Sequence, residues 1–250
     1  MNHGLKSIGL AGGHFASSIY RSKPVTIVSK HQLYEIANPF GVPVMAQMVL
    51  ICISAEGGFE VGDQWNYLFI VNNSTVNTVS GGFISDSGQV VGVTNGNGGN
   101  GVSLDAWRIN GSVGYLPANT YQYSLNLVGP VLPDRPDLAR LPQARRFTTR
   151  RRPAASSVLY SEPNPFAEAP AIIWPKARCT VAELGYSEGD EIDLCSFQGP
   201  TSYRPVIRSN RRLVDYRTPT ADDWICPHKT TGVISTMTLA NWQVYLEVIG

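Results

Sequence analysis

The stretch that decides the fold is CISAEGGFEVGD at residues 52–63, which returns 127 residues later as CTVAELGYSEGD at residues 179–190. Cys, Ala, Glu, Asp and two Gly stand at the same places in both segments, and Phe59 is matched by Tyr186. The glycines can adopt the positive φ angles at which a chain reverses. Because an apolar run precedes each segment, the pattern predicts a strand, a tight corner and a second strand.

The side chains that recur in this corner have predicted structural roles. The aromatic ring at Phe59 and Tyr186 is expected to pack the corner onto the core. The acidic side chains are expected to accept hydrogen bonds from N–H groups of the loop, with cation binding as the alternative. These acidic residues are Glu56 and Asp63 in the first segment, and Glu183 and Asp190 in the second.

Similarity between the two parts of the chain extends beyond the corner. Upstream, LY and NPF at 33–40 recur as LY and NPF at 159–166, and downstream YQYSLNLVG at 121–129 resembles WQVYLEVIG at 242–250. Matches in the same order indicate two copies of one module. The prediction is an all-β protein of two tandem related β-sandwich-like domains. Residues 1–130 hold an N-terminal arm and the first domain, 131–158 a Pro/Arg-rich linker, and 159–250 the second domain.

Composition supports the all-β prediction. Of 250 residues, 43% are hydrophobic and only 16% charged, with 24 Gly and 17 Pro, which is typical of strands joined by turns. The net charge of +1 gives no global field that would attract a nucleic acid or a membrane. The opening residues do not read as a signal peptide, and the apolar run at 42–55 is too short to span a bilayer.

Strands are predicted where apolar or alternating runs occur. Alternation is clearest at the two downstream matches, where every second residue from Tyr121 and from Trp242 is apolar or aromatic. The predicted strands are 44–54, 64–72, 76–85, 88–94, 120–129, 171–181, 190–197, 203–208, 211–216, 231–238 and 242–249.

The linker holds seven of the chain's fifteen arginines and no lysine. It can be a solvated spacer, or it can lie on an acidic surface of a neighbouring subunit, since arginine presents a planar fork to carboxylates. Nucleic acid is a weaker alternative, because Phe147 is the only aromatic residue among the arginines. The candidates for docking are Arg140, Arg145, Arg146, Arg150, Arg151 and Arg152.

The four cysteines fall into two groups. Cys52 and Cys179 hold the same position in the two copies, which suits a small buried side chain. Cys195 and Cys226 belong to the second copy alone and are candidates for crosslinking where the surroundings are oxidising. No cysteine spacing matches a zinc site, so no metal is predicted.

The sequence contains none of three common catalytic or nucleotide-binding motifs: the nucleophile elbow, the zinc-protease helix and the phosphate loop. The chain is therefore expected to be non-enzymatic and to need no cofactor. Carboxylate groups at 190–193 and 222–223 leave a polysaccharide hydrolase as an alternative. Tyr203 and Trp224 are expected to be exposed aromatics, which leaves a glycan-binding module as another.

The segment CTVAELGYSEGDE at 179–191, with ANWQVYL at 240–246, resembles the small β domains at the ends of tailed-bacteriophage structural proteins, and residues 52–64 are a looser copy. The resemblance implies a virion structural protein of the tail (fibre, collar or tip), assembled in the host cytoplasm. It also implies a homo-oligomer, trimeric or higher, that contacts other virion proteins. A head decoration protein and a host-surface glycan or receptor-binding module are the alternatives.

Overall fold

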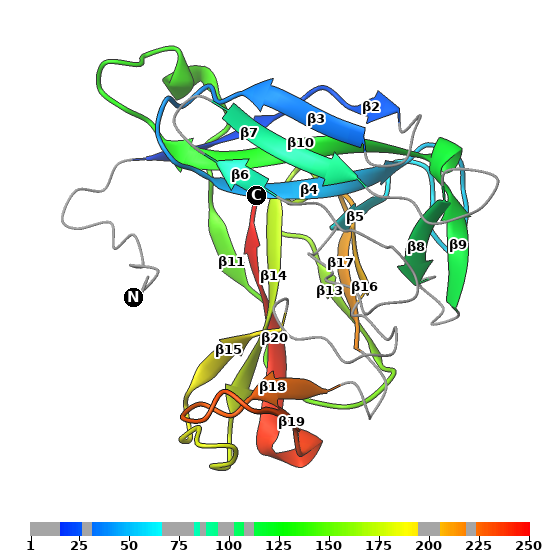
Figure 1. Cartoon of the computed structure of the whole chain (residues 1–250). Coiled ribbons are helices and arrows are strands. Elements are labelled where there is room, and N and C mark those ends of the chain that lie inside the picture. Colours follow the sequence, from blue (N-terminus) through cyan, green and yellow to red (C-terminus); the bar gives the residue numbers. More distant parts are fainter. Residues whose placement is uncertain are drawn as a thin grey trace.

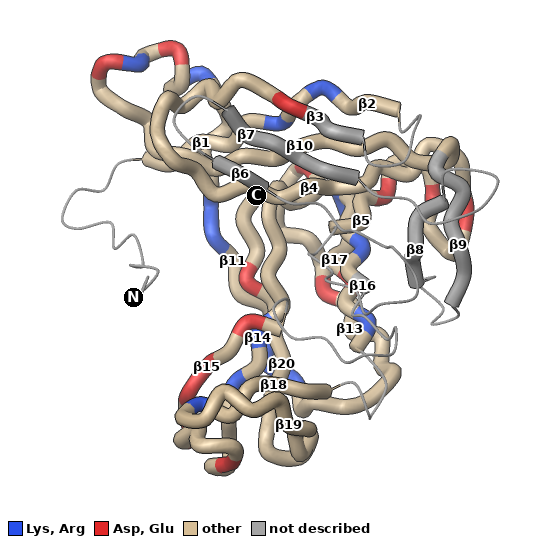
Figure 2. Tube along the Cα trace, viewed as in Figure 1, with Lys and Arg blue, Asp and Glu red and all other residues tan. Residues whose placement is uncertain are grey.

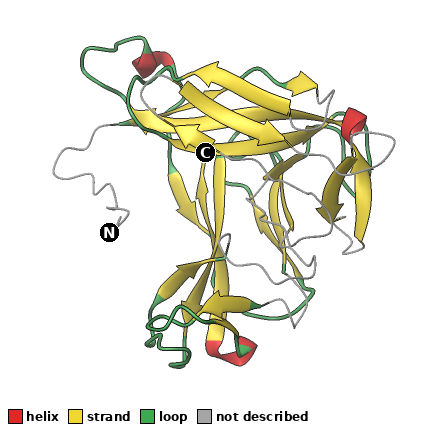
Figure 3. Ribbon diagram, in the orientation of Figure 1, coloured by secondary structure: helices red, strands yellow, loops and turns green. Residues whose placement is uncertain are grey.

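The computed structural model describes residues 16–26, 32–66, 83–85, 89–94, 103–107, 113–194, 206–218 and 224–250. Within these ranges the regular structure consists of β-strands and three short 3-10 helices (Figure 3), namely η1 (Ala118–Thr120), η2 (Leu138–Arg140) and η4 (Leu239–Asn241). All described strand pairings are antiparallel. The all-β prediction is confirmed. In the same ranges no helix is long and apolar enough to cross a membrane.

We call residues 16–130 the first unit. Its main sheet has the order β1-β10-β4-β5, with β2 also on β10, while β3-β7-β6 and β8-β9 form smaller sheets. Figure 1 shows β3, β7 and β6 as a layer over β10 and β4. The strands are β1 (Ser17–Arg21), β2 (Val25–Thr26), β3 (Gln32–Ala37), β4 (Met45–Cys52), β5 (Gln64–Asn66), β6 (Phe83–Ser85), β7 (Gln89–Thr94), β8 (Ser103–Trp107), β9 (Val113–Pro117) and β10 (Tyr121–Pro130).

We call residues 143–250 the second unit. Its strands pair in the corresponding order, β11-β20-β14-β15 with β12 also on β20, then β13-β17-β16, and a β18-β19 hairpin. The strands are β11 (Arg146–Thr148), β12 (Arg152–Pro153), β13 (Leu159–Pro163), β14 (Ile172–Cys179), β15 (Glu191–Asp193), β16 (Val206–Ser209), β17 (Leu213–Arg217), β18 (Ile225–Pro227), β19 (Ile234–Thr236) and β20 (Trp242–Ile249).

The registers of the central strands coincide in the two units. Cys52 lies opposite Tyr121 where β4 pairs with β10, and Cys179 lies opposite Trp242 where β14 pairs with β20. The neighbouring pairs β4·β5 and β14·β15 also share one register. The sequence matches at both ends of these strands therefore mark positions that are equivalent in three dimensions.

The equivalence begins earlier than the sequence predicts. In the predicted arm, β1 pairs with β10, and in the predicted linker β11 pairs with β20 in the same register, so that Tyr20 corresponds to Phe147. After each strand a hydroxyl side chain interrupts the pairing: Ser22 Oγ accepts a hydrogen bond from Leu125 N, and Thr149 Oγ1 accepts one from Leu246 N, both at 2.8 Å. The second part of the linker is thus sheet, not a spacer between domains.

The two units are joined by strand pairing as well as by the chain. Trp65 of β5 lies opposite Arg208 of β16, and Gln64 lies opposite Ser209, so that β5 and β16 connect strands of both units in one eight-stranded sheet. Figure 1 shows β5 beside β16 and β17 at this junction.

Each unit has its own core, and a third cluster is shared. The first core is built on β4 and β10, with Leu50, Tyr123 and Leu125 fully buried. The second is built on β14, β17 and β20. The shared cluster draws side chains from both units, namely Ile19, Val128, Ala171, Ile172 and Ile249.

Several strands arise where no apolar run predicts them. They include β1, β3, β8, β9, β11, β12, β13 and β18, which are short or carry polar and proline residues. Short edge strands gain their order from the strand beside them, so that their own sequence carries little signal.

Candidate interaction surface

The arginine-rich segment follows β10 and runs between the two units. Ile19 N donates to Pro142 O at 2.8 Å, and Ala144 N donates to Ser17 O at 2.7 Å, which fixes the segment to β1. Arg145 exchanges two backbone hydrogen bonds with Gly250, of 2.9 and 3.1 Å. The backbone at 142–145 is therefore held on both sides, and its side chains project from a fixed frame.

Two of the six predicted docking arginines are bound within the chain. Arg151 lies 3.2 Å from a carboxylate oxygen of Glu191 and 5.3 Å from the ring centre of Tyr245. Arg152 Nη2 donates to Glu162 Oε1 at 2.8 Å. Because these guanidinium groups already have partners, Arg151 and Arg152 serve the second unit itself.

The other four, Arg140, Arg145, Arg146 and Arg150, are exposed. No side-chain hydrogen bond or ion pair joins them to any residue in the described ranges. Figure 2 shows positive charge along β11 and on the loop that carries η2. We call these four residues the arginine strip. They lie within one segment of eleven residues, 140–150.

The Cys-led corners are built alike. Cys52 Sγ donates to Ser54 O at 3.2 Å, and Cys179 Sγ donates to Val181 O at 3.1 Å. Gly62, with φ of 91°, donates its N–H to Cys52 O. Gly189, with φ of 93°, donates in the same way to Cys179 O. The turn requires the left-handed backbone at both glycines.

The predicted roles of the two aspartates and of the two aromatic rings in the corners are confirmed. Asp63 Oδ2 accepts a hydrogen bond from Glu60 N at 2.9 Å, and Asp190 Oδ2 accepts one from Ser187 N at 2.8 Å. Phe59 is buried and meets the Tyr121 ring edge-on at 6.1 Å. Its counterpart Tyr186 meets Trp242 at 5.5 Å, also edge-on.

Glu183 links its corner to the start of β20. Its carboxylate accepts hydrogen bonds from Thr238 N at 2.9 Å, from Asn241 Nδ2 at 3.0 Å and from the indole Nε1 of Trp242. Burial by itself would raise the pKa of Glu183, but these donors favour the ionised form and leave the pKa below its usual value. The carboxylate therefore holds the corner against the start of β20.

Among the described residues, no group of three or more acidic, histidine or cysteine side chains is arranged to hold a metal ion.

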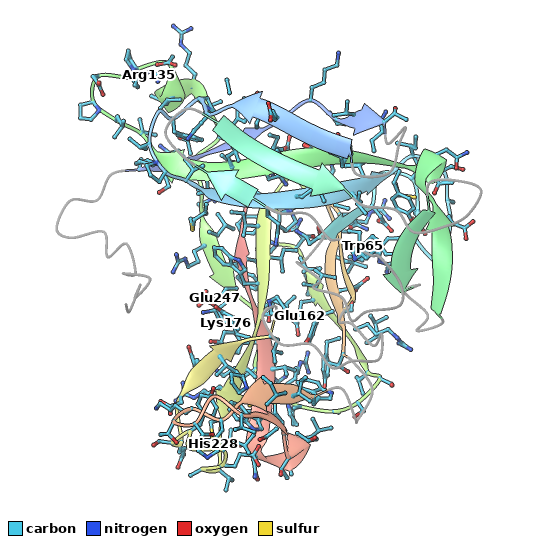
Figure 4. The ribbon with its side chains drawn as sticks, viewed as in Figure 1. Trp65, Arg135, Glu162, Lys176, His228 and Glu247 are labelled. Atoms are coloured by element: carbon cyan, nitrogen blue, oxygen red, sulfur yellow. The ribbon has the colours of Figure 1, made fainter. Side chains whose placement is uncertain are left out.

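The described carboxylates that were candidates for hydrolysis form ion pairs with lysines. Asp190 lies 2.6 Å from Lys229, and Asp193 lies 3.3 Å from Lys176. Lys176 also lies 3.4 Å from Glu247, and Figure 4 shows these two side chains together on β14 and β20. Burial opposes the charge on Lys176, yet the two carboxylates raise its pKa. Residues 222–223 lie outside the described ranges.

The structure contradicts the predicted exposure of Trp224 and the predicted crosslinking at Cys226. Trp224 is only 2% exposed and belongs to the second core, so it cannot offer a ring to a glycan in this conformation. Cys226 is buried in the same core, and burial foremost raises the pKa of its thiol to about 11. Both properties argue against crosslinking at Cys226. Tyr203 and Cys195 lie outside the described residues.

A small recess opens between the layers of the second unit. Its volume of about 10 Å³ is at the lower limit of what one water molecule needs, and the Arg152–Glu162 pair forms part of its wall. The recess is too small for a substrate. Its lining residues are Thr149, Arg150, Arg152, Tyr160, Glu162, Val214, Tyr216, Val244, Tyr245 and Leu246.

The sequence did not predict a buried polar contact between the units, which Gln47 makes with the backbone of Ile173. Gln47 Oε1 accepts from Ile173 N at 2.8 Å, and Gln47 Nε2 donates to Ile173 O at 2.9 Å. Asn66 Nδ2 also donates to Gln47 Oε1 at 2.7 Å, and Asn126 Nδ2 donates to Ala171 O at 3.0 Å. The only signal in the sequence is that Gln47 interrupts an apolar run.

Comparison with known proteins adds no relative: the chain matches neither a protein-family model nor a curated protein sequence.

Proposed function

We propose that the chain is a non-enzymatic structural protein of a bacteriophage virion, placed in the tail (fibre, collar or tip), and that it docks on neighbouring subunits through the arginine strip. The observation that carries the proposal is the strip itself. Its four guanidinium groups are exposed and lack described partners, while hydrogen bonds to β1 and to Gly250 hold the backbone between them.

Such an arrangement is well suited to binding. A fixed backbone reduces the entropy that is lost when a partner binds. Arginine gives bidentate contacts to carboxylates, so the expected partner is an acidic patch on another virion protein. The resemblance of residues 179–191 and 240–246 to the β domains of phage tails supports placing that partner in a phage particle.

We further propose that the two units are copies of one ancestral module. The support is the shared register of β4·β10 and β14·β20, and the recurrence of the edge strands β1 and β11.

The first experiment asks whether the chain is part of a particle. Virions would be purified from the organism that encodes the chain, and quantitative mass spectrometry would compare the chain with the major capsid protein. The proposal expects a fixed copy number that is retained through density-gradient purification. Loss of the chain during purification, or its absence, would contradict a structural role.

The second experiment tests the strip. Reversing the charge at Arg140, Arg145, Arg146 and Arg150 to Glu should reduce incorporation into particles by about tenfold or more, since like charges across an interface cost several kcal/mol. The matched control is R211E/R212E, two exposed arginines outside the strip. Equal incorporation of the strip variant and the control would refute docking through the strip.

A further inference from the structure

The contact between the two units has one clear geometry. The outer edge of β5 in the first unit is covered by β16 of the second unit. Side chains reinforce the pairing: Ser209 Oγ donates to Asn66 Oδ1 at 3.0 Å, and Asn210 Nδ2 donates to Asp63 Oδ1 at 2.7 Å. One strand edge thus accepts a strand from the other unit.

Each partner in this contact has a counterpart in the opposite unit. The counterpart of β5 is β15, because Trp65 pairs with Leu50 as Ile192 pairs with Ala177. The counterpart of β16 is β6. Each is the outer strand of a three-strand set, β3-β7-β6 or β13-β17-β16, and Ser85 opposite Val90 corresponds to Ser209 opposite Val214.

In the described part of the chain neither counterpart has a partner on its outer edge. The sheet β11-β20-β14-β15 ends at β15, and the sheet β3-β7-β6 ends at β6. Leu194 N donates to Pro175 O, and Cys179 N donates to Asp190 O. Because antiparallel strands alternate the direction of their peptide groups, Glu191 and Asp193 direct their N–H and C=O groups away from β14.

We propose that the β15 edge of one copy pairs with the β6 edge of a second copy, and so repeats between molecules the contact that β5 and β16 make within one. In this register Glu191 lies opposite Ser85, and Ile192 lies opposite Ile84. Two different surfaces meet, so the contact is head-to-tail, and it generates a ring where the rotation closes and a filament where it does not.

The charge of the β15 edge does not prevent this pairing. Charged side chains on an edge strand commonly block association. Here Glu191 is paired with Arg151 at 3.2 Å and Arg178 at 3.6 Å, and Asp193 is paired with Lys176 at 3.3 Å. The carboxylates are neutralised by their own chain, and the backbone groups remain available.

The open edges of β3 and β13 lack this support. β3 and β13 also end their sheets, but no pairing within the described chain shows what would cover them. The β1 edge is occupied by residues 142–145. β11, the counterpart of β1, also ends its sheet, but the segment on β1 forms only an isolated bridge there, between Ser18 and Gln143. The pairing of β15 with β6 is therefore a contact between regular strands for which the molecule itself supplies a template.

The test uses two proline variants of the full chain. E191P removes an outward N–H from β15, and S85P removes the corresponding one from β6, because proline has no N–H to donate. Light scattering coupled to size-exclusion chromatography should show wild-type masses above the 27.2 kDa monomer that rise with concentration. Each variant alone should be monomeric. E191T and S85T, which keep the N–H, should behave as wild type.

Mixing the two variants gives the sharpest result. E191P keeps an intact β6 edge, and S85P keeps an intact β15 edge, so the two variants can pair with each other. The mixture should form dimers and no larger species, because the remaining edge of each partner is blocked. A monomeric wild type, proline variants that still form oligomers, or a mixture of folded variants that stays monomeric would overturn the proposal.

A second measurement covers the case in which a proline variant does not fold. A mixture of E191C and S85C should form an interchain disulfide, since residues opposite each other in this register lie within disulfide range. E188C mixed with S85C is the control, and no E191C–S85C product would likewise overturn the pairing. The inference does not depend on the proposed function. Self-assembly without incorporation into virions would contradict only the proposed function. A monomer found in virions would contradict only the pairing of β15 with β6.

Discussion

The carboxylate of Glu183 accepts a hydrogen bond from the indole Nε1 of Trp242, so the corner after β14 is tied to the first residue of β20. At the equivalent place in the first unit the aromatic residue donates to a backbone oxygen. The residue equivalent to Trp242 is Tyr121, whose hydroxyl donates instead to the backbone oxygen of Glu56 at 3.5 Å. The two aromatic residues therefore anchor their corners through different acceptors, a carboxylate at Trp242 and a backbone oxygen at Tyr121.

We expect E183Q to lower the free energy of unfolding by about 1–3 kcal/mol at neutral pH, because hydrogen bonds to a charged group are lost. The folded pKa of Glu183 is depressed, so its contribution is complete above the unfolded pKa of about 4.3 and disappears as the pH falls through the folded pKa. Urea unfolding at several pH values should show the two proteins converging at acid pH. E188Q, at an exposed position of the same corner, is the control and should cost less. A difference independent of pH would contradict this role of Glu183.

We expect Q47L to destabilise the protein by about 2–4 kcal/mol, because it leaves Ile173 N, Ile173 O and Asn66 Nδ2 without their buried partner. Since this contact joins the units, the variant should also make unfolding less cooperative. Urea unfolding followed by tryptophan fluorescence and by circular dichroism would give separate midpoints. Q122A, at a half-buried position of β10, should leave one shared midpoint. Coincident transitions in Q47L would show that other contacts suffice.

We expect G129A to destabilise by about 1–3 kcal/mol through overpacking. A Cβ at Gly129 would lie 2.6 Å from the Phe40 ring and 2.8 Å from Val44 Cγ1. Combining G129A with F40L should cost less than the sum of the single changes, because the smaller side chain leaves room. Additive costs in a thermal-unfolding cycle would rule out this clash.

We expect R208M to cost about 3–5 kcal/mol, because it strands a buried carboxylate. Asp215 is 1% exposed and accepts from Arg208 Nε at 2.7 Å. Arg208 Nη1 also donates to Gly58 O at 3.0 Å, which connects the second unit to the first corner. The exposed R212A is the control and should change stability by less than about 0.5 kcal/mol. A loss no larger than that of the control would show that Asp215 finds another donor or a proton.

The repeated Cys-led corner was predictable because its chemistry is local. Turns that need positive φ select glycine, and a short loop selects a side chain able to accept its own N–H groups. The long strands β4, β10, β14 and β20 were predictable too, since their runs are apolar or alternate. The short edge strands were not, because Ser17–Arg21 and Arg146–Thr148 share little sequence although they occupy one register.

By itself the sequence determined that the chain is all-β, that the Cys-led segment occurs twice, and where the central strands and corners lie. Tertiary structure alone decided that β5 joins β16, that Gln47 reaches Ile173, that Trp224 and Cys226 face inward, and that the arginine-rich segment completes a sheet. The physical reason is that backbone hydrogen bonds between strands are the same for almost every residue. Which edges meet is set by the edges that remain open once each core has packed.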